Sequence, residues 1–216
     1  DQADVRRRVE TIHQRYGDRA AILLGDIIYA RGFVISTEVE GAASLLAECT
    51  REICIGEILQ VGNAGNLELT LQQYQEIIHR KTAILYGLSC KLGSMLSGAT
   101  SEQVAALESF GNRMGEAFQI IDDSLDLVGD PEVVGKSLGT DLANGKLTLP
   151  LLLLRDSLEG AEREQLMQLL ADCYQSEASE SSRVEMATLL ANHGIMQRVR
   201  GRAKDAIESA LSDLRG

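Results

Sequence analysis

Residues 115–150 read GEAFQIIDDSLDLVGDPEVVGKSLGTDLANGKLTLP, and this stretch combines a clear helical pattern with the densest group of candidate functional residues in the chain. Its apolar residues recur every three or four positions as far as Val128, which is the spacing of one face of an α-helix. Glycines and Pro131 then interrupt the pattern up to Gly145, and an apolar run follows from Leu147 to Leu154. The stretch therefore predicts a helix, a glycine-punctuated loop and a second helix.

The same apolar spacing continues through the rest of the chain, and the alternation typical of strands is absent. Two prolines, few aromatic residues and abundant helix formers agree with this pattern. We therefore expect one all-α domain over residues 1–216, with a polar loop at 175–182. Candidate N-caps are Thr70 and the pair Thr100 and Ser101, although Val104 stands where a capping box that starts at Ser101 would need Glu. The expected helices lie near residues 17–36, 41–62, 70–97, 101–129, 144–156, 161–173 and 182–214.

Charge and cysteine content exclude several classes of protein. The 21 Lys and Arg residues against 32 Asp and Glu residues give a formal charge of −11, which disfavours binding to the phosphate backbone of nucleic acids. The four cysteines lack C-x-x-C spacing, so we expect free thiols in a reducing cytoplasm. The apolar run from Leu147 to Leu154 is far shorter than the roughly 20 residues that a transmembrane helix needs. Since the chain starts at Asp1 in a charged stretch, we expect it to begin inside a longer protein.

Three aspartates share one face of the helix predicted near 101–129. At 100° per residue, Asp122, Asp123 and Asp126 fall with Gln119 within an arc of about 100°. This arc borders an apolar stripe that we expect to be buried, and the aspartates should therefore be half-buried. One interpretation is a solvated acidic face. The other is a Mg²⁺ site, because carboxylate oxygens about one helical turn apart can hold Mg²⁺ that is shared with a substrate phosphate. The apolar stripe consists of Leu107, Met114, Phe118, Ile121, Leu125 and Val128.

Lysines in the following loop favour the metal interpretation. Lys136 and Lys146 follow the aspartates in a glycine-rich segment that can fold back over the helix end, so metal and lysines together would clamp a diphosphate. A P-loop is excluded, because five residues separate the glycines where that motif has four, and no strand precedes them. Two further basic groups, the Arg6 and Arg7 pair and the Lys81–Thr82 pair, carry little information alone.

Taken together, these motifs resemble the trans-type polyprenyl diphosphate synthases, and the resemblance spans nearly the whole chain. It implies a large helical bundle around a deep central cavity, usually in a homodimer. It also implies Mg²⁺-dependent head-to-tail condensation of an allylic diphosphate with isopentenyl diphosphate. The motifs, in chain order, are D-x4-R-R (Asp1, Arg6, Arg7), L-x-G-D (Leu23 to Asp26), G-E-x-x-Q (Gly56 to Gln60), K-T-A (Lys81 to Ala83), F-Q-x-x-D-D-x-x-D (Phe118 to Asp126), G-K-x-x-G-x-D (Gly135 to Asp141) and G-K-x-T-L-P (Gly145 to Pro150).

The resemblance also implies a role for each matching residue. Asp122, Asp123 and Asp126 match the second aspartate-rich motif, which binds Mg²⁺, and Asp1 matches the last aspartate of the first such motif. The other matches concern substrate. Arg6 would reach the allylic diphosphate, and Arg7 would reach the isopentenyl diphosphate. The allylic leaving group would be held by Lys81, Lys136 and Lys146, with Thr82 beside Lys81. Phe118 and Gln119 would lie near the reacting double bond and the developing cation.

Two features depart from the family pattern. The first two aspartates of the family's first motif, and the helices ahead of that motif, are absent from this chain, and Arg8 stands where the family usually has Gly. Two other functions therefore stay open: a non-catalytic regulatory subunit of a heteromeric prenyl synthase, and a terpene cyclase of the same fold. The paired arginines and the G-K-x-x-G-x-D motif favour the synthase over the cyclase.

Overall fold

The computed structural model describes residues 4–6, 9–129, 140–175 and 180–215, and almost all of these residues are helical. This confirms the expected all-α class, with a two-residue antiparallel ladder near the N-terminus as the one addition in the described part. The strands and first helices are β1 (Val5–Arg6), β2 (Val9–Glu10), α1 (Ile12–Tyr16), α2 (Asp18–Ser36) and α3 (Ala42–Gly62). The remaining elements are α4 (Leu71–Ile78), η1 (His79–Ala83), α5 (Ile84–Leu96), α6 (Ser101–Val128), α8 (Thr140–Ala143), α9 (Leu149–Arg155), α10 (Gly160–Gln175), α11 (Glu180–Asn192) and α12 (Ile195–Asp213).

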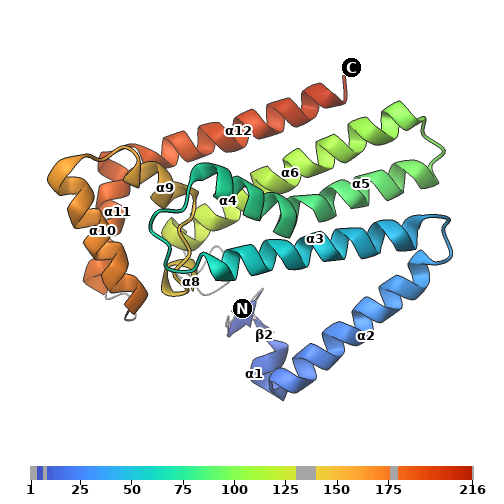
Figure 1. The fold of residues 1–216 in the computed structure, drawn as a ribbon, viewed down its shortest axis with the longest axis horizontal. Helices are drawn as coiled ribbons and strands as arrows, with labels where there is room; N and C mark the ends of the chain where they lie inside the picture. The colour runs from blue at the N-terminus through green and yellow to red at the C-terminus, as the bar shows by residue number, and fades with distance from the viewer. Residues whose placement is uncertain (1–3, 7–8, 130–139, 176–179, 216) are drawn as a thin grey trace.

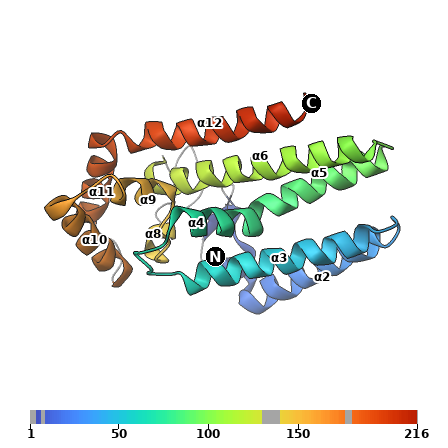
Figure 2. The same cartoon turned by 45° about the horizontal axis from the view of Figure 1, so that its top comes forward.

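Four long rods lie side by side: α3, the continuous α4–η1–α5 unit, α6 and α12 (Figures 1 and 2). The α6 helix is central, because it packs against α5 on one side and α12 on the other. The short helices α9, α10 and α11 pack together at one end of these rods (Figure 1). Among the described helices, none is long and apolar enough to cross a bilayer.

The best-packed part of the core lies at the α9 end. Every residue of α9 is buried, and Leu151, Leu152 and Leu154 are almost fully so. Burying a leucine side chain stabilises a fold by roughly 1.5–3 kcal/mol, so this short helix is a strong anchor. The chain segment just before α9 is therefore held firmly against the rods. Side chains that complete this core come from α10, α11 and α12: Leu166, Leu170, Met186, Leu190, Ile195 and Val199.

Several helix boundaries differ from the sequence predictions. The helix expected at 70–97 contains a π-helical turn, η1. The helix expected at 182–214 is broken at Gly194, whose φ of 60° favours glycine. The helix expected at 144–156 starts only at Leu149, because Pro150 is suited to the first helical turn and Lys146 to Thr148 are extended.

Capping and loop predictions were also partly wrong. The capping box at the start of α6 is formed by Thr100 and Gln103, one residue ahead of the Ser101 and Val104 pair considered above. Thr70 forms the same motif with Gln73 at α4, which confirms it as an N-cap. The polar loop expected at 175–182 is shorter, since α10 extends to Gln175 and α11 begins at Glu180; residues 176–179 lie outside the described residues.

The side of α6 that is buried is not the one predicted. Asp123 and Asp126, expected to be half-buried, are only 6% and 3% exposed, whereas Phe118 is 53% exposed. Ile121, Leu125 and Val128 are exposed as well. The reason is tertiary: α4, α8 and α9 pack on the side of α6 that carries Ile120 and Asp123, whereas Phe118, Ile121, Leu125 and Val128 of the apolar stripe are left uncovered within the described residues.

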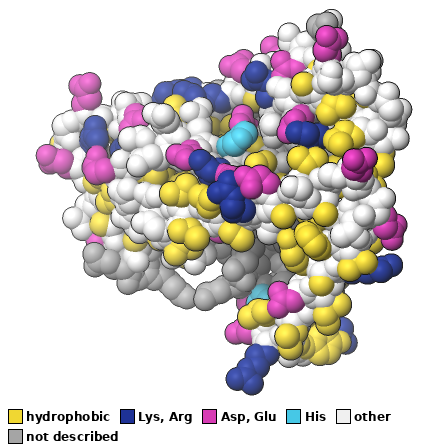
Figure 3. All heavy atoms as spheres, turned by 45° about the vertical axis from the view of Figure 1, so that its right-hand side comes forward, with side chains coloured by type: hydrophobic (Ala, Val, Ile, Leu, Met, Phe, Trp, Pro, Cys, Tyr) yellow, Lys and Arg dark blue, Asp and Glu magenta, His cyan; other side chains and the backbone are white. Residues whose placement is uncertain are grey.

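The α2 helix is the most weakly packed long helix. None of its residues is buried, and Ile22, Ile27 and Ile28 are about two-thirds exposed. In Figure 3, hydrophobic side chains gather on the part of the molecule that projects downward and on the surface next to it. Ile58 and Val61 on the neighbouring α3 are also strongly exposed.

Candidate active site

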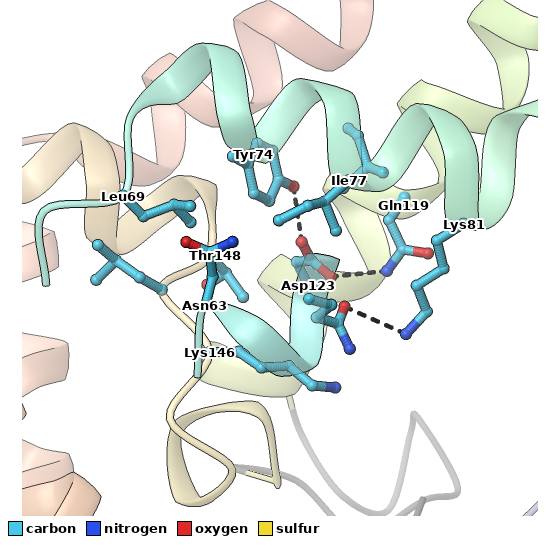
Figure 4. A pocket seen from close by; sticks show the side chains of 12 residues that line it. Asn63, Leu69, Tyr74, Ile77, Lys81, Gln119, Asp123, Lys146 and Thr148 are labelled. Carbon is cyan, nitrogen blue, oxygen red and sulfur yellow. Dashed lines mark hydrogen bonds between the residues drawn. The ribbon is translucent and has the colours of Figure 1, made fainter. Parts of the chain in front are cut away.

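A pocket lies where α3 ends, between the α4–η1 unit, α6 and the segment 146–148 (Figure 4). It brings together Lys81, Gln119, Asp123 and Lys146, which the sequence analysis had singled out. Its cavity volume is about 30 Å³, room for one or two water molecules. The side chains of Lys81 and Lys146 extend toward the same side of the pocket (Figure 4). The remaining lining residues are Gln60, Asn63, Leu69, Tyr74, Ile77, Ile78, Leu147 and Thr148.

Lys81 and Thr82 lie in the π-helical turn η1, a local departure from α-helix that is frequent at functional sites. Two glycines allow this turn to sit tightly between neighbouring helices. A Cβ on Gly56 of α3 would be 2.6 Å from the backbone nitrogen of Lys81, and a Cβ on Gly115 of α6 would be 2.5 Å from Cα of Ala83. The backbone that carries Lys81 and Thr82 is therefore held on both sides by contacts that only glycine permits.

The polar side chains of η1 contact α3 and α6. Lys81 donates through Nζ to Oε1 of Gln60 at 3.2 Å and lies 3.2 Å from the Glu57 carboxylate. Thr82 donates through its hydroxyl to Oε1 of Gln119 at 2.7 Å. The G-E-x-x-Q motif thus supplies two groups that hold the Lys81 ammonium at the pocket, with Gly56 of the same motif supplying the space for its backbone.

Of the three aspartates, Asp123 is the one that lines the pocket, and it is buried. Its Oδ2 accepts a hydrogen bond of 2.6 Å from the Tyr74 hydroxyl, and its Oδ1 accepts one of 2.7 Å from Nε2 of Gln119. Burial raises the pKa of Asp123 to about 7; the Tyr74 hydrogen bond opposes this, while the nearby Asp141 adds to it. A cation at the pocket would favour the ionised form of this carboxylate.

Asp126 ties the segment after the glycine-rich loop to the end of α6. Its Oδ1 accepts from the Thr140 hydroxyl at 3.1 Å, and its Oδ2 accepts from the Asp141 backbone N–H at 2.9 Å. Asp141 in turn lies 2.6 Å from the Lys146 ammonium. Burial opposes charge on Lys146, but Asp141, together with the charges of Asp123 and Asp126, outweighs it and raises the pKa of Lys146, so this lysine is a cation.

Lys146 is also fixed through its backbone. The preceding Gly145, at φ 70°, accepts a 2.8 Å hydrogen bond at its carbonyl from the Gly65 backbone N–H, at the end of α3. A Cβ at Gly145 would be 2.8 Å from that nitrogen, so the close approach also requires glycine. The next residues lead into the fully buried α9, which anchors the other side of Lys146.

The donor chemistry of this pocket fits Mg²⁺ shared with a substrate. Within the described residues no three acidic, histidine or cysteine side chains are grouped so as to hold an ion by themselves. Mg²⁺ usually takes only one or two carboxylates and completes its coordination with water and substrate phosphate. Asp122, Asp123 and Asp126 offer hard oxygen donors on one end of α6, beside two lysines that suit a phosphate. The side chains at this end of α6 are therefore suited to hold Mg²⁺.

The structure brings together some of the predicted site residues and leaves others undescribed. Lys81, Thr82, Gln119, Asp123 and Lys146 are joined by the pocket or its hydrogen bonds. Phe118 lies on the adjoining exposed face of α6, where its ring contacts that of Tyr86 at a centroid distance of 5.5 Å. Outside the described residues lie Asp1, Arg7, Lys136 and the side chain of Arg6, whose backbone belongs to β1.

Sequence reasoning missed three contributors. Glu57 and Gln60 belong to a motif that the sequence analysis quoted without assigning it a role. Tyr74 was missed altogether. Its position, four residues before Ile78 and seven before Lys81, places the three residues on one helical face, and this spacing could have indicated that they share a side of the helix.

Comparison with known proteins agrees with this architecture. A family model described as polyprenyl synthetase matches residues 1–189. The chain is similar to the short chain isoprenyl diphosphate synthase of Methanothermobacter thermautotrophicus, at 36% identity over 79% of this chain and 54% of the relative. It is also similar to heptaprenyl diphosphate synthase component 2 of Bacillus subtilis, at 34% identity over 96% of this chain and 64% of the relative.

A solved structure gives the same result for the fold. The crystal structure of a polyprenyl synthase from Caulobacter crescentus, complexed with calcium and isoprenyl diphosphate, superposes with a TM-score of 0.87. Its sequence is 32% identical, and the match covers 99% of this chain and 65% of that one. The chain spans about half the length of the curated relatives it matches.

Proposed function

The chain belongs to the polyprenyl synthetase family, and on this premise we propose that it condenses an allylic prenyl diphosphate with isopentenyl diphosphate, head to tail, in a Mg²⁺-dependent reaction. The observation that carries the proposal is the convergence of Lys81, Lys146 and Asp123 on one pocket, from segments far apart in the sequence. Two cations beside buried carboxylates suit a diphosphate with its metal. The products would be a longer polyprenyl diphosphate and free diphosphate.

The residues of the pocket support the first step, in which the allylic C–O bond breaks and its electron pair leaves with the diphosphate. Lys81 and Lys146 would bind the leaving group and stabilise the negative charge that develops on it. Asp122, Asp123 and Asp126 would hold Mg²⁺, which when bound would neutralise further charge on the same diphosphate. Thr82 and Gln119 would face the allylic carbon, with Gln119 held in place by Asp123.

The exposed apolar side chains beside the pocket support the second step. The double bond of isopentenyl diphosphate would attack the allylic cation, and a proton lost from the adjacent carbon would pass to the released diphosphate. The cation must meet that double bond before it meets water, which requires an apolar environment. Tyr86, Phe118, Ile121 and Leu125 form an apolar surface next to the pocket that would lie along the hydrocarbon tail.

The test is a condensation assay with ¹⁴C-isopentenyl diphosphate and geranyl, farnesyl or geranylgeranyl diphosphate as the allylic partner. We expect label to enter longer prenyl products in Mg²⁺ and to fall to background in EDTA, with recovery when Mg²⁺ is restored. Products that form from the allylic diphosphate alone would identify a cyclase and contradict the proposal. The absence of any product with every allylic partner would also contradict it.

One similarity favours a second candidate. The Bacillus relative is named component 2 of its synthase, so this chain could instead be one component of a heteromeric enzyme. The same assay with a co-expressed partner protein separates the two cases. Activity that appears only with the partner would support a heteromeric synthase, and activity of the chain alone would support the first proposal.

We also propose a homodimer that uses the exposed surface of α2 and α3. Ile22, Ile27, Ile28, Ile58 and Val61 are all more than 60% exposed, and exposed apolar surface of this extent marks an interaction site. Light scattering coupled to size exclusion should give twice the mass of the chain. Ile28→Glu should shift the protein toward the monomer, whereas Val184→Glu, at an exposed apolar position on α11, should not. A monomeric wild-type protein would contradict this assignment.

The proposed compartment is the cytoplasm. All four cysteines are free thiols in the structure, and two of them are buried. Thiols persist in reducing compartments, where structural disulfides are rare. Mass spectrometry of the protein from its native source, after alkylation without reductant, should find all four thiols labelled.

A further inference from the structure

A single chain of hydrogen bonds crosses the pocket and links three elements. Tyr74 of α4 donates to Asp123 of α6, and Gln119 of α6 donates to the other oxygen of Asp123 (Figure 4). Thr82 of η1 donates to Gln119. Asp123 and Gln119 line the pocket, and Thr82 is joined to them through Gln119. Tyr74 also lines the pocket, but it is only 4% exposed, and its hydroxyl is bonded to Asp123.

We propose that Tyr74 is a positioning residue for the metal–diphosphate site. Its hydroxyl fixes the Asp123 carboxylate and, through Asp123, the orientations of Gln119 and Thr82. This inference rests on the function proposed above and adds to it a residue whose chemistry takes no direct part in the reaction.

Tyr74 is suited to this role because its own position is rigid. The N-terminus of α4 is closed by the capping box of Thr70 and Gln73. The buried Arg155 guanidinium donates to the carbonyls of Leu67 and Leu69, just ahead of that cap, at 2.7 and 2.8 Å. The segment that leads into α4 is thus attached to α9, the best-packed helix of the core. A hydroxyl carried on this frame provides a fixed reference point for the pocket.

The hydrogen-bond capacity of Asp123 shows why its orientation matters. An ionised carboxylate has two oxygens and about four acceptor positions. Tyr74 occupies one position on Oδ2 and Gln119 occupies one on Oδ1, so each oxygen keeps one further position for a metal or its water. Without the Tyr74 hydroxyl, the carboxylate can rotate about its χ2 angle, because terminal sp³–sp² torsions are broad. Rotation would misdirect both its remaining lone pairs and the Gln119 amide.

The chain offers a matched control for the loss of a buried tyrosine hydroxyl. The Tyr174 hydroxyl is also enclosed, and it has no hydrogen-bond partner among the described residues. Tyr174→Phe therefore removes the same atom in a similar setting without touching the pocket. An effect at Tyr74 that is absent at Tyr174 reports the hydrogen bond to Asp123 and not the general effect of deleting a phenolic oxygen.

The experiment is calorimetric titration of the protein with inorganic diphosphate in saturating Mg²⁺, followed by titration with Mg²⁺ at fixed diphosphate. Outer hydrogen-bond partners of metal ligands typically contribute 10–100-fold in affinity. We therefore expect Tyr74→Phe to weaken both apparent affinities by about that factor, and Tyr174→Phe to leave them within about twofold. Circular dichroism and the fitted number of sites confirm that the variants are folded. Affinities of Tyr74→Phe within twofold of wild type would overturn the positioning role.

A second measurement does not depend on the folding of Tyr74→Phe. The five tyrosines can be labelled with 3-fluorotyrosine, and the ¹⁹F signals assigned by replacing the other four tyrosines one at a time. Mg²⁺ with inorganic diphosphate should shift the Tyr74 signal and leave the Tyr174 signal in place. An unshifted Tyr74 signal in a protein that binds the ligand would overturn the inference. Wild-type protein that binds no Mg²⁺-diphosphate would contradict the proposed function instead.

Discussion

Replacing Asp123 with asparagine is expected to lower kcat/KM for condensation by about 10²–10³-fold, the effect of removing one charged or dipolar group that stabilises a transition state. Asparagine has nearly the same shape, so Tyr74 can still donate to its side-chain carbonyl. What the variant loses is the negative charge beside the proposed metal, and the acceptor for Gln119. Steady-state kinetics at several Mg²⁺ concentrations measure the loss.

Two comparisons make this prediction specific. Asp205→Asn, at an exposed position on α12, removes one negative charge from outside the pocket that Asp123 lines and should leave kcat/KM nearly unchanged. Wild-type kinetics in Asp123→Asn, with Mg²⁺ near its normal requirement, would show that this carboxylate has no part in the reaction.

The same variant has a signature in the metal-free protein. Because burial raises the folded-state pKa of Asp123 to about 7, its favourable contribution to folding is complete below the unfolded pKa near 4 and is lost as pH rises through about 7. Asparagine does not titrate. In EDTA, the free energy of unfolding of Asp123→Asn relative to wild type should therefore rise between pH 5 and pH 8, as measured by urea denaturation. A difference that is flat across this range would contradict the buried, protonatable state of Asp123.

Gly56→Ala is expected to disturb the site through the contact between α3 and η1. The new Cβ would be 2.6 Å from the Lys81 backbone nitrogen and 3.0 Å from its Cα, so either α3 or η1 must move. Overpacking of this kind costs typically 1–3 kcal/mol, which exceeds the roughly 0.5–1 kcal/mol that alanine contributes over glycine inside a helix. We expect lower stability in urea denaturation and, because Lys81 moves with its backbone, an affinity for Mg²⁺-diphosphate that falls by about tenfold or more.

Gly93→Ala provides the control for helix propensity. Gly93 lies within α5, and no atom lies within 4 Å of the position its Cβ would take. This variant should be as stable as wild type or more stable by about 0.5–1 kcal/mol, with unchanged diphosphate affinity. If Gly56→Ala behaves like Gly93→Ala, the close approach of α3 to η1 does not position Lys81.

The sequence predicted the site in part. The aspartates, Lys81, Gln119 and Lys146 were identified from residue type, spacing and family resemblance, and the structure places Lys81, Gln119, Asp123 and Lys146 around one pocket. Tyr74 was not identified, because its role depends on a hydrogen bond to a residue 49 positions later, which no local pattern encodes. Gly56 and Gly115 appear in the sequence as ordinary helix residues, since their contacts with η1 exist only between packed helices.

The helical class, most helix positions and the row of carboxylates on α6 can be read from the residues alone, because all of these follow from the 3.6-residue repeat and from residue chemistry. Which side of α6 is buried could not be read in this way. Phe118 and Ile121 were expected inside and are exposed, whereas Asp123 and Asp126 are enclosed by α4 and α8. The physical reason is that periodicity defines the faces of a helix, while burial depends on which neighbours the whole chain packs against each face.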